Sequence, residues 1–158
     1  MSGIGNTTTN IQTLRRAIDA AEREALAPHG LTVAGFELLD LLSRDPGISA
    51  VWAAARLGVS AQSTGTVLLR LSQAGLITRE TTSGVGRPAA IRPSTAGHKV
   101  LLTARAVADE VDDRFTAGMR PAEVDELNRL LGMGLAAFPN ERLERMRTNA
   151  AAGMTAGR

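Results

Sequence analysis

The side chains best suited to chemistry in this sequence are polar groups spaced three and four residues apart. Gln62, Thr66, Arg70 and Gln73 have this spacing, so a helix would carry them on one face. Glutamine can bind adenine through two hydrogen bonds, arginine can bind guanine or a phosphate, and serine or threonine can bind either. The pattern favours contact with the bases and phosphates of DNA, and the alternative is an ordinary solvated helix face.

The helix that would carry this face is expected at residues 61–74, after a short helix and a tight turn. Residues 53–57 form a brief apolar helix, Gly58 and Val59 turn the chain, and Ser60 has the side chain of a helix N-cap. Gly75 supplies the stop. The opposite, apolar stripe of the second helix consists of Val67, Leu68, Leu71 and Ala74. This is the pattern of a helix-turn-helix, whose second helix enters the major groove.

A two-stranded wing is expected directly after this helix. Residues 76–81 have the composition of a strand, residues 83–88 that of a turn, and residues 89–92 that of a returning strand. Between Arg56 and Ser94 the chain has five arginines and one acid, Glu80, a local charge of +4 against +2 for the whole chain. A basic excess on a helix and its adjacent hairpin is typical of a phosphate-binding surface.

Individual residues of this segment have more than one possible role. Arg87, at the hairpin tip, is expected to enter a minor groove, whose negative potential attracts arginine. Arg79 would pair with Glu80 or anchor a phosphate, Arg92 would contact a phosphate or stay exposed, and Thr64 would contact a phosphate or cap the first turn. Inside a helix, glycine at position 65 is less favourable than alanine by about 1 kcal/mol. A close approach of DNA or of a packed neighbour would explain why a residue without a side chain stands there. The alternative is evolutionary drift. The candidate DNA-binding residues are Gln62, Ser63, Thr64, Thr66, Arg70, Arg79, Arg87 and Arg92.

Other chemistries have little support in the sequence. The chain has 158 residues, of which 44% are hydrophobic and 3% aromatic, so it can bury an aliphatic core. The absence of cysteine excludes disulfides, cysteine-ligated zinc and thiol switches. His29 and His98 lie far apart without a second ligand beside them, so we expect no metal. We also expect no cofactor and no enzyme activity, because no nucleophile–base pair or cofactor fingerprint is present. Without a membrane-length apolar run or a signal segment, a cytoplasmic protein is expected.

The flanking helices have more apolar residues than a small winged domain can cover. Asn10, Thr32 and Ser49 are expected to cap the early helices, the first of them at residues 11–27, and Ile48 with Ser49 is expected to form a minimal strand. The last two helices are expected from after Gly97 to residue 117 and over residues 121–138. We therefore expect a mainly α fold, with a winged helix-turn-helix at 31–94, a dimerisation region at 10–30 and 95–147, a disordered segment at 1–9 and a flexible tail at 148–158. Phe36 and Trp52 are weak candidates for lining a ligand pocket, since large aromatics are more often core residues.

The order and spacing of these elements resemble the MarR family of bacterial transcription regulators over about residues 26–138. Leu31 and Thr32 with residues 36–39 resemble its "LT…vL" entry, residues 55–60 its "A..LgvS" turn, and residues 71–79 its "Le..GLv.R" segment. The wing signature D-x-R-x-x-x-x-x-L-T-x-x-G fits from Val85 to Gly97, with Arg87 at the wing arginine, and residues 119–123 resemble the "Ls.eE" start of the last helix. Three positions depart from the family pattern: Val85 replaces the wing aspartate, Pro93 a leucine and Arg120 a capping serine.

The resemblance implies a homodimer that binds a pseudo-palindromic operator in double-stranded DNA and represses neighbouring genes. Two-fold symmetry would present two recognition helices about one DNA turn apart, roughly 34 Å. The resemblance also implies release of DNA when a small aromatic or anionic ligand binds between the dimer helices and the winged domain. The alternative is a winged-helix protein without an effector, which binds DNA architecturally or acts through protein partners.

Overall fold

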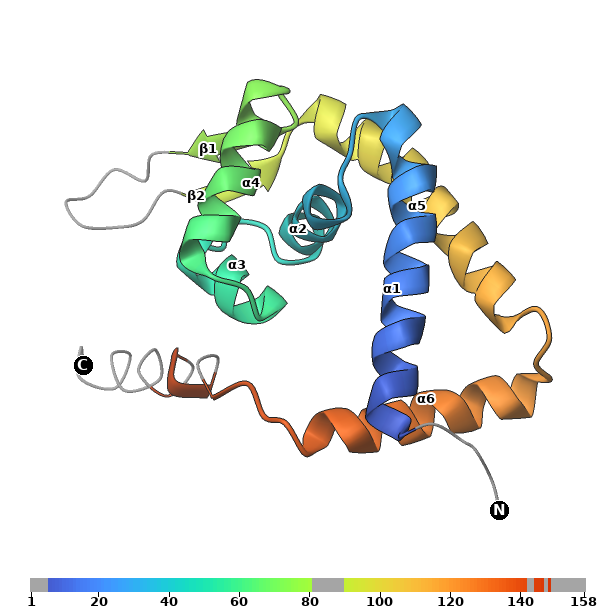
Figure 1. Cartoon of the computed structure of the whole chain (residues 1–158). Helices are drawn as coiled ribbons and strands as arrows, with labels where there is room; N and C mark the ends of the chain where they lie inside the picture. The colour runs from blue at the N-terminus through green and yellow to red at the C-terminus, as the bar shows by residue number, and fades with distance from the viewer. Residues whose placement is uncertain (1–5, 81–89, 142–143, 147, 149–158) are drawn as a thin grey trace, which may run out of the picture.

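The computed structural model describes residues 6–80, 90–141, 144–146 and 148 (Figure 1). Its elements in chain order are α1 (Thr7–Leu26), the 3-10 turn η1 (Ala27–His29), α2 (Val33–Arg44), α3 (Ala50–Leu57), α4 (Ala61–Gln73), β1 (Ile77–Glu80), β2 (Ala90–Pro93), α5 (Thr95–Thr116) and α6 (Pro121–Ala136). The mainly α winged-helix fold predicted from the sequence is confirmed.

Polar caps set where the helices begin. Thr32, Ser49, Ser60 and Ser94 each accept a backbone N–H from the first turn of α2, α3, α4 and α5. α1 begins earlier than predicted, because Asn6 and not Asn10 is its cap and accepts the N–H of Thr8 at 3.1 Å. Part of the segment expected to be disordered is therefore helical. α5 also begins earlier, at Thr95, because Ser94 caps it.

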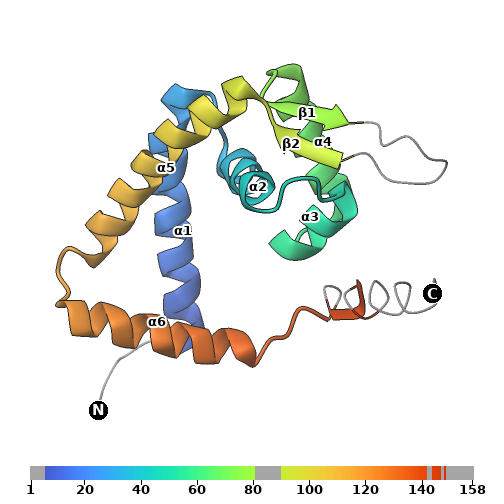
Figure 2. The ribbon, with the colours of Figure 1, turned by 180° about the vertical axis from the view of Figure 1, so that it is seen from behind.

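The core surrounds α2, which lies between α3 and α4 on one side and α1 with α5 on the other (Figures 1 and 2). Its largest fully buried side chains are all leucines: Leu26, Leu38, Leu39, Leu42, Leu68 and Leu101. This agrees with the aliphatic core expected from the composition. Because α1 and α5 pack on α2, the outer helices are anchored to the domain that carries α4.

β1 and β2 form an antiparallel pair in which Arg79 lies opposite Ile91 and Thr78 opposite Arg92. The minimal strand predicted at Ile48 and Ser49 is wrong, because those residues lie in a loop. The turn before them gives the sheet a hydrogen bond from the Gly47 N–H to the Ile91 carbonyl at 3.1 Å. A strand needs a continued ladder of such bonds, and this turn does not supply it.

The start of α5 is locked to the end of α4. The Ser94 hydroxyl donates to the Gly75 carbonyl at 2.6 Å and accepts the Gly97 N–H at 3.0 Å. A Cβ on Gly97 would lie 2.0 Å from the carbonyl oxygen of Leu76, so only glycine allows this close approach. The first turn of α5 is therefore fixed against the residues that directly follow α4.

A buried carboxylate also joins α2 to α5. Asp40 is only 7% exposed, and it accepts the Arg105 Nε at 2.8 Å and a second hydrogen bond from Arg44. A buried charge is costly unless it is paired, so this pair holds the facing sides of the two helices together. The 65 residues between Asp40 and Arg105 make this a tertiary contact.

α1, α5 and α6 lie along the three sides of a triangle (Figure 2). α6 has no buried residue, and its apolar side chains Leu130, Leu131, Met133 and Leu135 are 50%, 40%, 61% and 74% exposed. It ends at Ala136, before the predicted Phe138. Among the described helices, none alone is long and apolar enough to cross a membrane; α1 with η1 and α2 reaches that length and composition only as a pair bent by 76°.

Candidate nucleic-acid interface

α4 has one buried side and one exposed side. Leu68 and Leu71 are 1% and 4% exposed and pack in the core. The polar stripe on the other side, Gln62, Thr66, Arg70 and Gln73, is exposed along its whole length. Ala74, predicted in the apolar stripe, is exposed, because the helix has already ended at Gln73. The side of α4 that the sequence assigns to DNA is therefore open.

Thr64 does not belong to this open side. It is 2% exposed, and its Oγ1 donates to the Ser60 carbonyl at 3.1 Å. The prediction of a phosphate contact for Thr64 is wrong, because the residue lies four positions before Leu68 and shares its buried face. The second role left open by the sequence, capping the first turn, is not the one seen either, because Ser60 is the cap of α4.

The first turn of α4 is held in place by its cap. The Ser60 Oγ accepts the N–H of Ser63 at 3.0 Å, while the side chain of Ser63 is exposed. The Thr66 hydroxyl donates to the Gln62 carbonyl at 3.1 Å and keeps its oxygen lone pairs and methyl group for another molecule. Because the Ser60 cap fixes the first turn of α4, the side chains of Ser63 and Thr66 project from defined backbone positions, which favours specific contacts.

Gly65 also lies on the exposed side of α4. A Cβ built on it meets nothing within 4 Å. A packed neighbour within the described residues therefore does not explain this glycine. Of the explanations that the sequence leaves open for Gly65, close approach of DNA and drift are the two that still apply.

The arginines of the predicted site lie on α4 and on the two strands that follow it. Arg70 is exposed in the last turn of α4, and Arg79 and Arg92 are exposed on β1 and β2. A Cβ on Gly47 would lie 3.6 Å from the Arg92 Nη2, so this guanidinium packs against the turn after α2. Gly75, with a φ of 68°, connects α4 to β1 and keeps helix and sheet adjacent. Arg87 lies outside the described residues.

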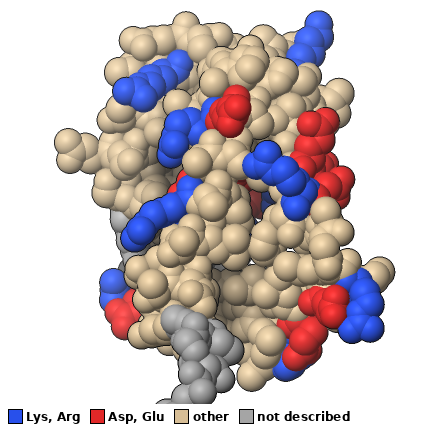
Figure 3. Space-filling model, turned by 45° about the vertical axis from the view of Figure 1, so that its right-hand side comes forward, with Lys and Arg blue, Asp and Glu red and all other residues tan. Residues whose placement is uncertain are grey.

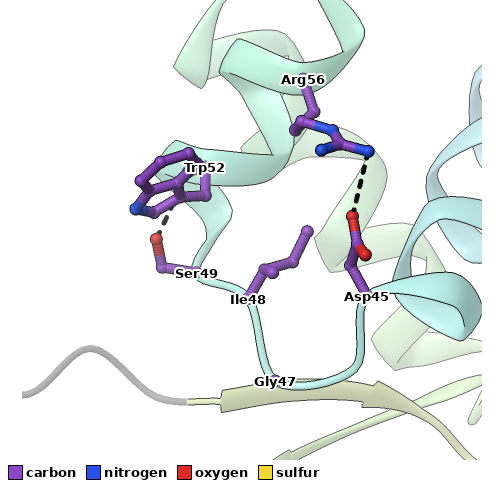
Figure 4. Close-up of a pocket in the computed structure, with 6 residues that line it drawn as sticks. All are labelled: Asp45, Gly47, Ile48, Ser49, Trp52 and Arg56. Atoms are coloured by element: carbon purple, nitrogen blue, oxygen red, sulfur yellow. Dashed lines mark hydrogen bonds and ion pairs between the residues drawn. The ribbon is translucent and has the colours of Figure 1, made fainter. Parts of the chain in front are cut away.

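A cavity of about 480 Å³ lies beside α3, next to the turn that follows α2 (Figure 4). Trp52 and Arg56 line it from α3, and Asp45, Gly47, Ile48 and Ser49 line it from the turn. The Arg56 Nη2 lies 3.2 Å from the Asp45 Oδ2. Phe36 is half-buried and packs against the core, and it is not among the residues that line this cavity.

Acidic side chains gather where α1 faces α2. Burial raises the pKa of the Glu22 carboxyl, and the nearby charges of Glu37 and Asp19 raise it further. Arg15, 2.8 Å from Asp19, opposes this rise. Within the described part of the chain, no three His, Asp or Glu side chains are grouped so that they could hold a metal ion.

Residues 29–88 match the model of the MarR family. The HTH-type transcriptional repressor Rv2887 of Mycobacterium tuberculosis is 33% identical over 107 residues, which are 68% of this chain and 77% of the relative. The chain belongs to the MarR family. Members of the MarR family are DNA-binding transcription factors and not enzymes.

Solved structures of the same relative are similar in fold to this MarR family chain. The crystal structure of Rv2887 in complex with DNA covers 82% of this chain and 97% of that chain, with a TM-score of 0.69 and 26% identity. Its complex with salicylic acid covers 84% of this chain and 98% of that chain, with a TM-score of 0.68 and 26% identity.

Sequence reasoning missed two features of this MarR family chain. One is the Arg56–Asp45 pair that borders the Trp52 cavity, and the other is the Asp40–Arg105 pair between α2 and α5. The partners of each pair are too far apart in the sequence to be neighbours on one helix, so helical spacing does not predict either pair. The signal for Thr64 was present, because its distance of four and seven residues from Leu68 and Leu71 places it on their stripe.

Proposed function

We propose that this protein is a repressor that binds a pseudo-palindromic operator through Gln62, Ser63, Thr66 and Arg70 of α4. Arg79, Arg87 and Arg92 of the wing would supply phosphate or minor-groove contacts. The observation that carries this proposal is the exposed polar side of a serine-capped helix whose other side is fixed in the core. The DNA complex of the relative supports it.

We further propose a homodimer formed by α1, α5 and α6, within the predicted dimerisation region at 10–30 and 95–147. The support is the exposed apolar surface of α6, together with Ile11 and Leu14 of α1, which are 49% and 37% exposed. Figure 3 shows wide uncharged areas on the side formed by these helices, with acidic side chains beside basic ones. Apolar surface of this kind is typical of a site that another protein covers.

The proposed effector is a small aromatic anion, since the relative forms complexes with salicylic acid and p-aminosalicylic acid. Binding would favour a conformation whose two DNA-binding domains no longer match the half-sites, and so release the operator. A thermal-shift screen in which no aromatic acid stabilises the protein, with DNA affinity intact, would support the alternative of a regulator without an effector.

The test is selection of bound sequences from a random double-stranded DNA library, followed by affinity measurements across a range of salt concentrations. The expected product is an inverted repeat with half-site centres about 10 bp apart. Replacing Arg70 by Gln should weaken binding to it. Arg44→Gln is the matched control, because it removes one exposed positive charge from the end of α2, outside α4 and outside the helices of the proposed dimer. No enriched sequence, or equal losses in both variants, would contradict the proposal.

A further inference from the structure

The exposed polar side of α4 has an apolar side chain near its centre. Leu69 is 55% exposed, whereas Leu68 and Leu71 of the same helix are buried in the core. Because the step from Gln62 to Leu69 is almost two full helical turns, the two residues lie only about 20° apart around the helix axis. Gln73 follows one turn later and is also exposed. About half of the Leu69 side chain is therefore available to another molecule, in the middle of the side assigned to DNA.

Leu69 is also accessible from the direction of the helix N-terminus. A side chain in a helix leans toward the N-terminus and lies over the residue one turn earlier. For Leu69 that residue is Gly65, and a Cβ built on it meets nothing within 4 Å. Gly65 therefore adds no side chain that would shield Leu69, which lets a second molecule approach both residues.

The surroundings of Leu69 are those of a surface that binds nucleic acid. α4 contains no acidic residue, and its exposed side carries amides, hydroxyls and the guanidinium of Arg70. Arg79 is exposed on β1, the strand that follows the helix. A positively charged surface rich in hydrogen-bonding groups is typical of contact with DNA. The apolar group that DNA presents in its major groove is the C5-methyl group of thymine.

A leucine beside glutamines matches the major-groove edge of an A·T base pair. This edge presents the methyl group and O4 of thymine together with N6–H and N7 of adenine. A glutamine amide binds adenine through two hydrogen bonds, whereas a leucine can pack on the methyl group. We propose that Leu69 is a specificity-determining residue, which packs on the methyl group of one thymine in each half-site. The inference rests on the proposed function and adds a base contact that the polar stripe alone does not provide.

Replacing thymine by uracil isolates this contact, because uracil pairs with adenine in the same way and lacks only the methyl group. The operator selected by the full-length protein is synthesised with its thymines replaced by uracil, one symmetric pair of positions at a time. Affinity is measured by fluorescence anisotropy. At one position in each half-site, the wild type should bind about fourfold more weakly for each methyl group removed, which is the usual effect of burying one such group.

Variants at residue 69 assign the methyl contact to its side chain. Leu69→Ala should bind the thymine and uracil forms of this operator equally well. Leu69→Met, which keeps an apolar side chain of similar volume, should retain most of the preference for thymine. Val51→Ala is the matched control, because it shortens another exposed aliphatic side chain, 51% exposed on α3, and should keep the full preference. The ratio of the two affinities is measured within one variant, so a change that weakens binding to both forms equally does not alter it.

The outcomes separate this inference from the proposed function. If the wild type selects an operator but binds every uracil form as tightly as the thymine form, only the inference about Leu69 fails. It also fails if Leu69→Ala keeps the preference for thymine, or if Thr66→Ser loses this preference and Leu69→Ala does not, since the methyl group would then contact Thr66. If the wild type selects no sequence at all, the proposed function fails, and the inference fails with it.

Discussion

Replacing Gly65 by Ala should stabilise the protein and weaken its binding to DNA. The added methyl group enters open space, since nothing lies within 4 Å of a Cβ at this position. Alanine is better than glycine inside a helix by about 0.8–1.0 kcal/mol, so the free energy of unfolding should rise by about 1 kcal/mol. For a chain of this size, such a change corresponds to an increase in Tm of about 2–4 °C.

The same methyl group should cost affinity for the operator. Gly65 lies on the exposed side of α4, one residue before Thr66 and three after Gln62. If this side lies in the major groove, the methyl group occupies space that DNA fills in the complex. Overpacking of a close-fitting contact costs about 1–3 kcal/mol, which is roughly a five- to 150-fold loss of affinity.

The assay combines denaturant unfolding with fluorescence anisotropy on a labelled operator fragment. Thr103→Ala is the matched control, because it raises helix propensity at an exposed position of α5. It should stabilise the protein without changing DNA affinity. Unchanged operator affinity in Gly65→Ala would refute the close approach of DNA to α4, and a loss of stability would refute the open space around Gly65.

Three further predictions follow from single residues. Arg87→Ala should weaken binding to all DNA sequences and lower the slope of log affinity against log salt by about one unit per wing, and an unchanged slope would remove Arg87 from the interface. Gly97→Ala should destabilise the fold by about 1–3 kcal/mol or more in urea unfolding, because the new Cβ would lie 2.0 Å from the Leu76 carbonyl oxygen, and an unchanged midpoint would contradict that contact. Glu22→Gln should raise Tm more at about pH 8 than at about pH 4. The raised pKa of Glu22 means that the folded state holds its proton more tightly than the unfolded state, so the wild type loses stability as the pH rises above the ordinary value of 4.5. An equal Tm difference at both pH values would show that burial does not penalise the Glu22 charge.

The features that the sequence predicted well are local. Thr32, Ser49 and Ser60 were identified as caps because a capping bond joins residues only two or three apart. The open side of α4 was predicted because helical periodicity alone separates Gln62 and Arg70 from Leu68. Asn6 was missed as the cap of α1 because Asn10 has the same side chain at a second plausible start.

The features that the sequence did not predict depend on contacts between distant segments. Nothing around Asp40 indicates that Arg105 approaches it, and nothing around Trp52 indicates that the turn at Asp45 leaves a cavity beside it. The strand expected at Ile48 failed for the same reason, because a strand forms only where a partner extends the ladder. Gly97 could be matched to a family position, but the carbonyl oxygen of Leu76 that requires it is seen only in three dimensions.

The most direct measurement of the central claim is cleavage of operator DNA by an iron chelate attached to α4. Because the chain has no cysteine, Gln73→Cys gives a single thiol for labelling at the exposed end of the polar stripe. The account predicts two clusters of cuts about 10 bp apart, one in each half-site, and no cuts from a chelate at Asp109→Cys on α5. No cleavage from residue 73, or equal cleavage from residue 109, would show that the polar side of α4 does not face DNA.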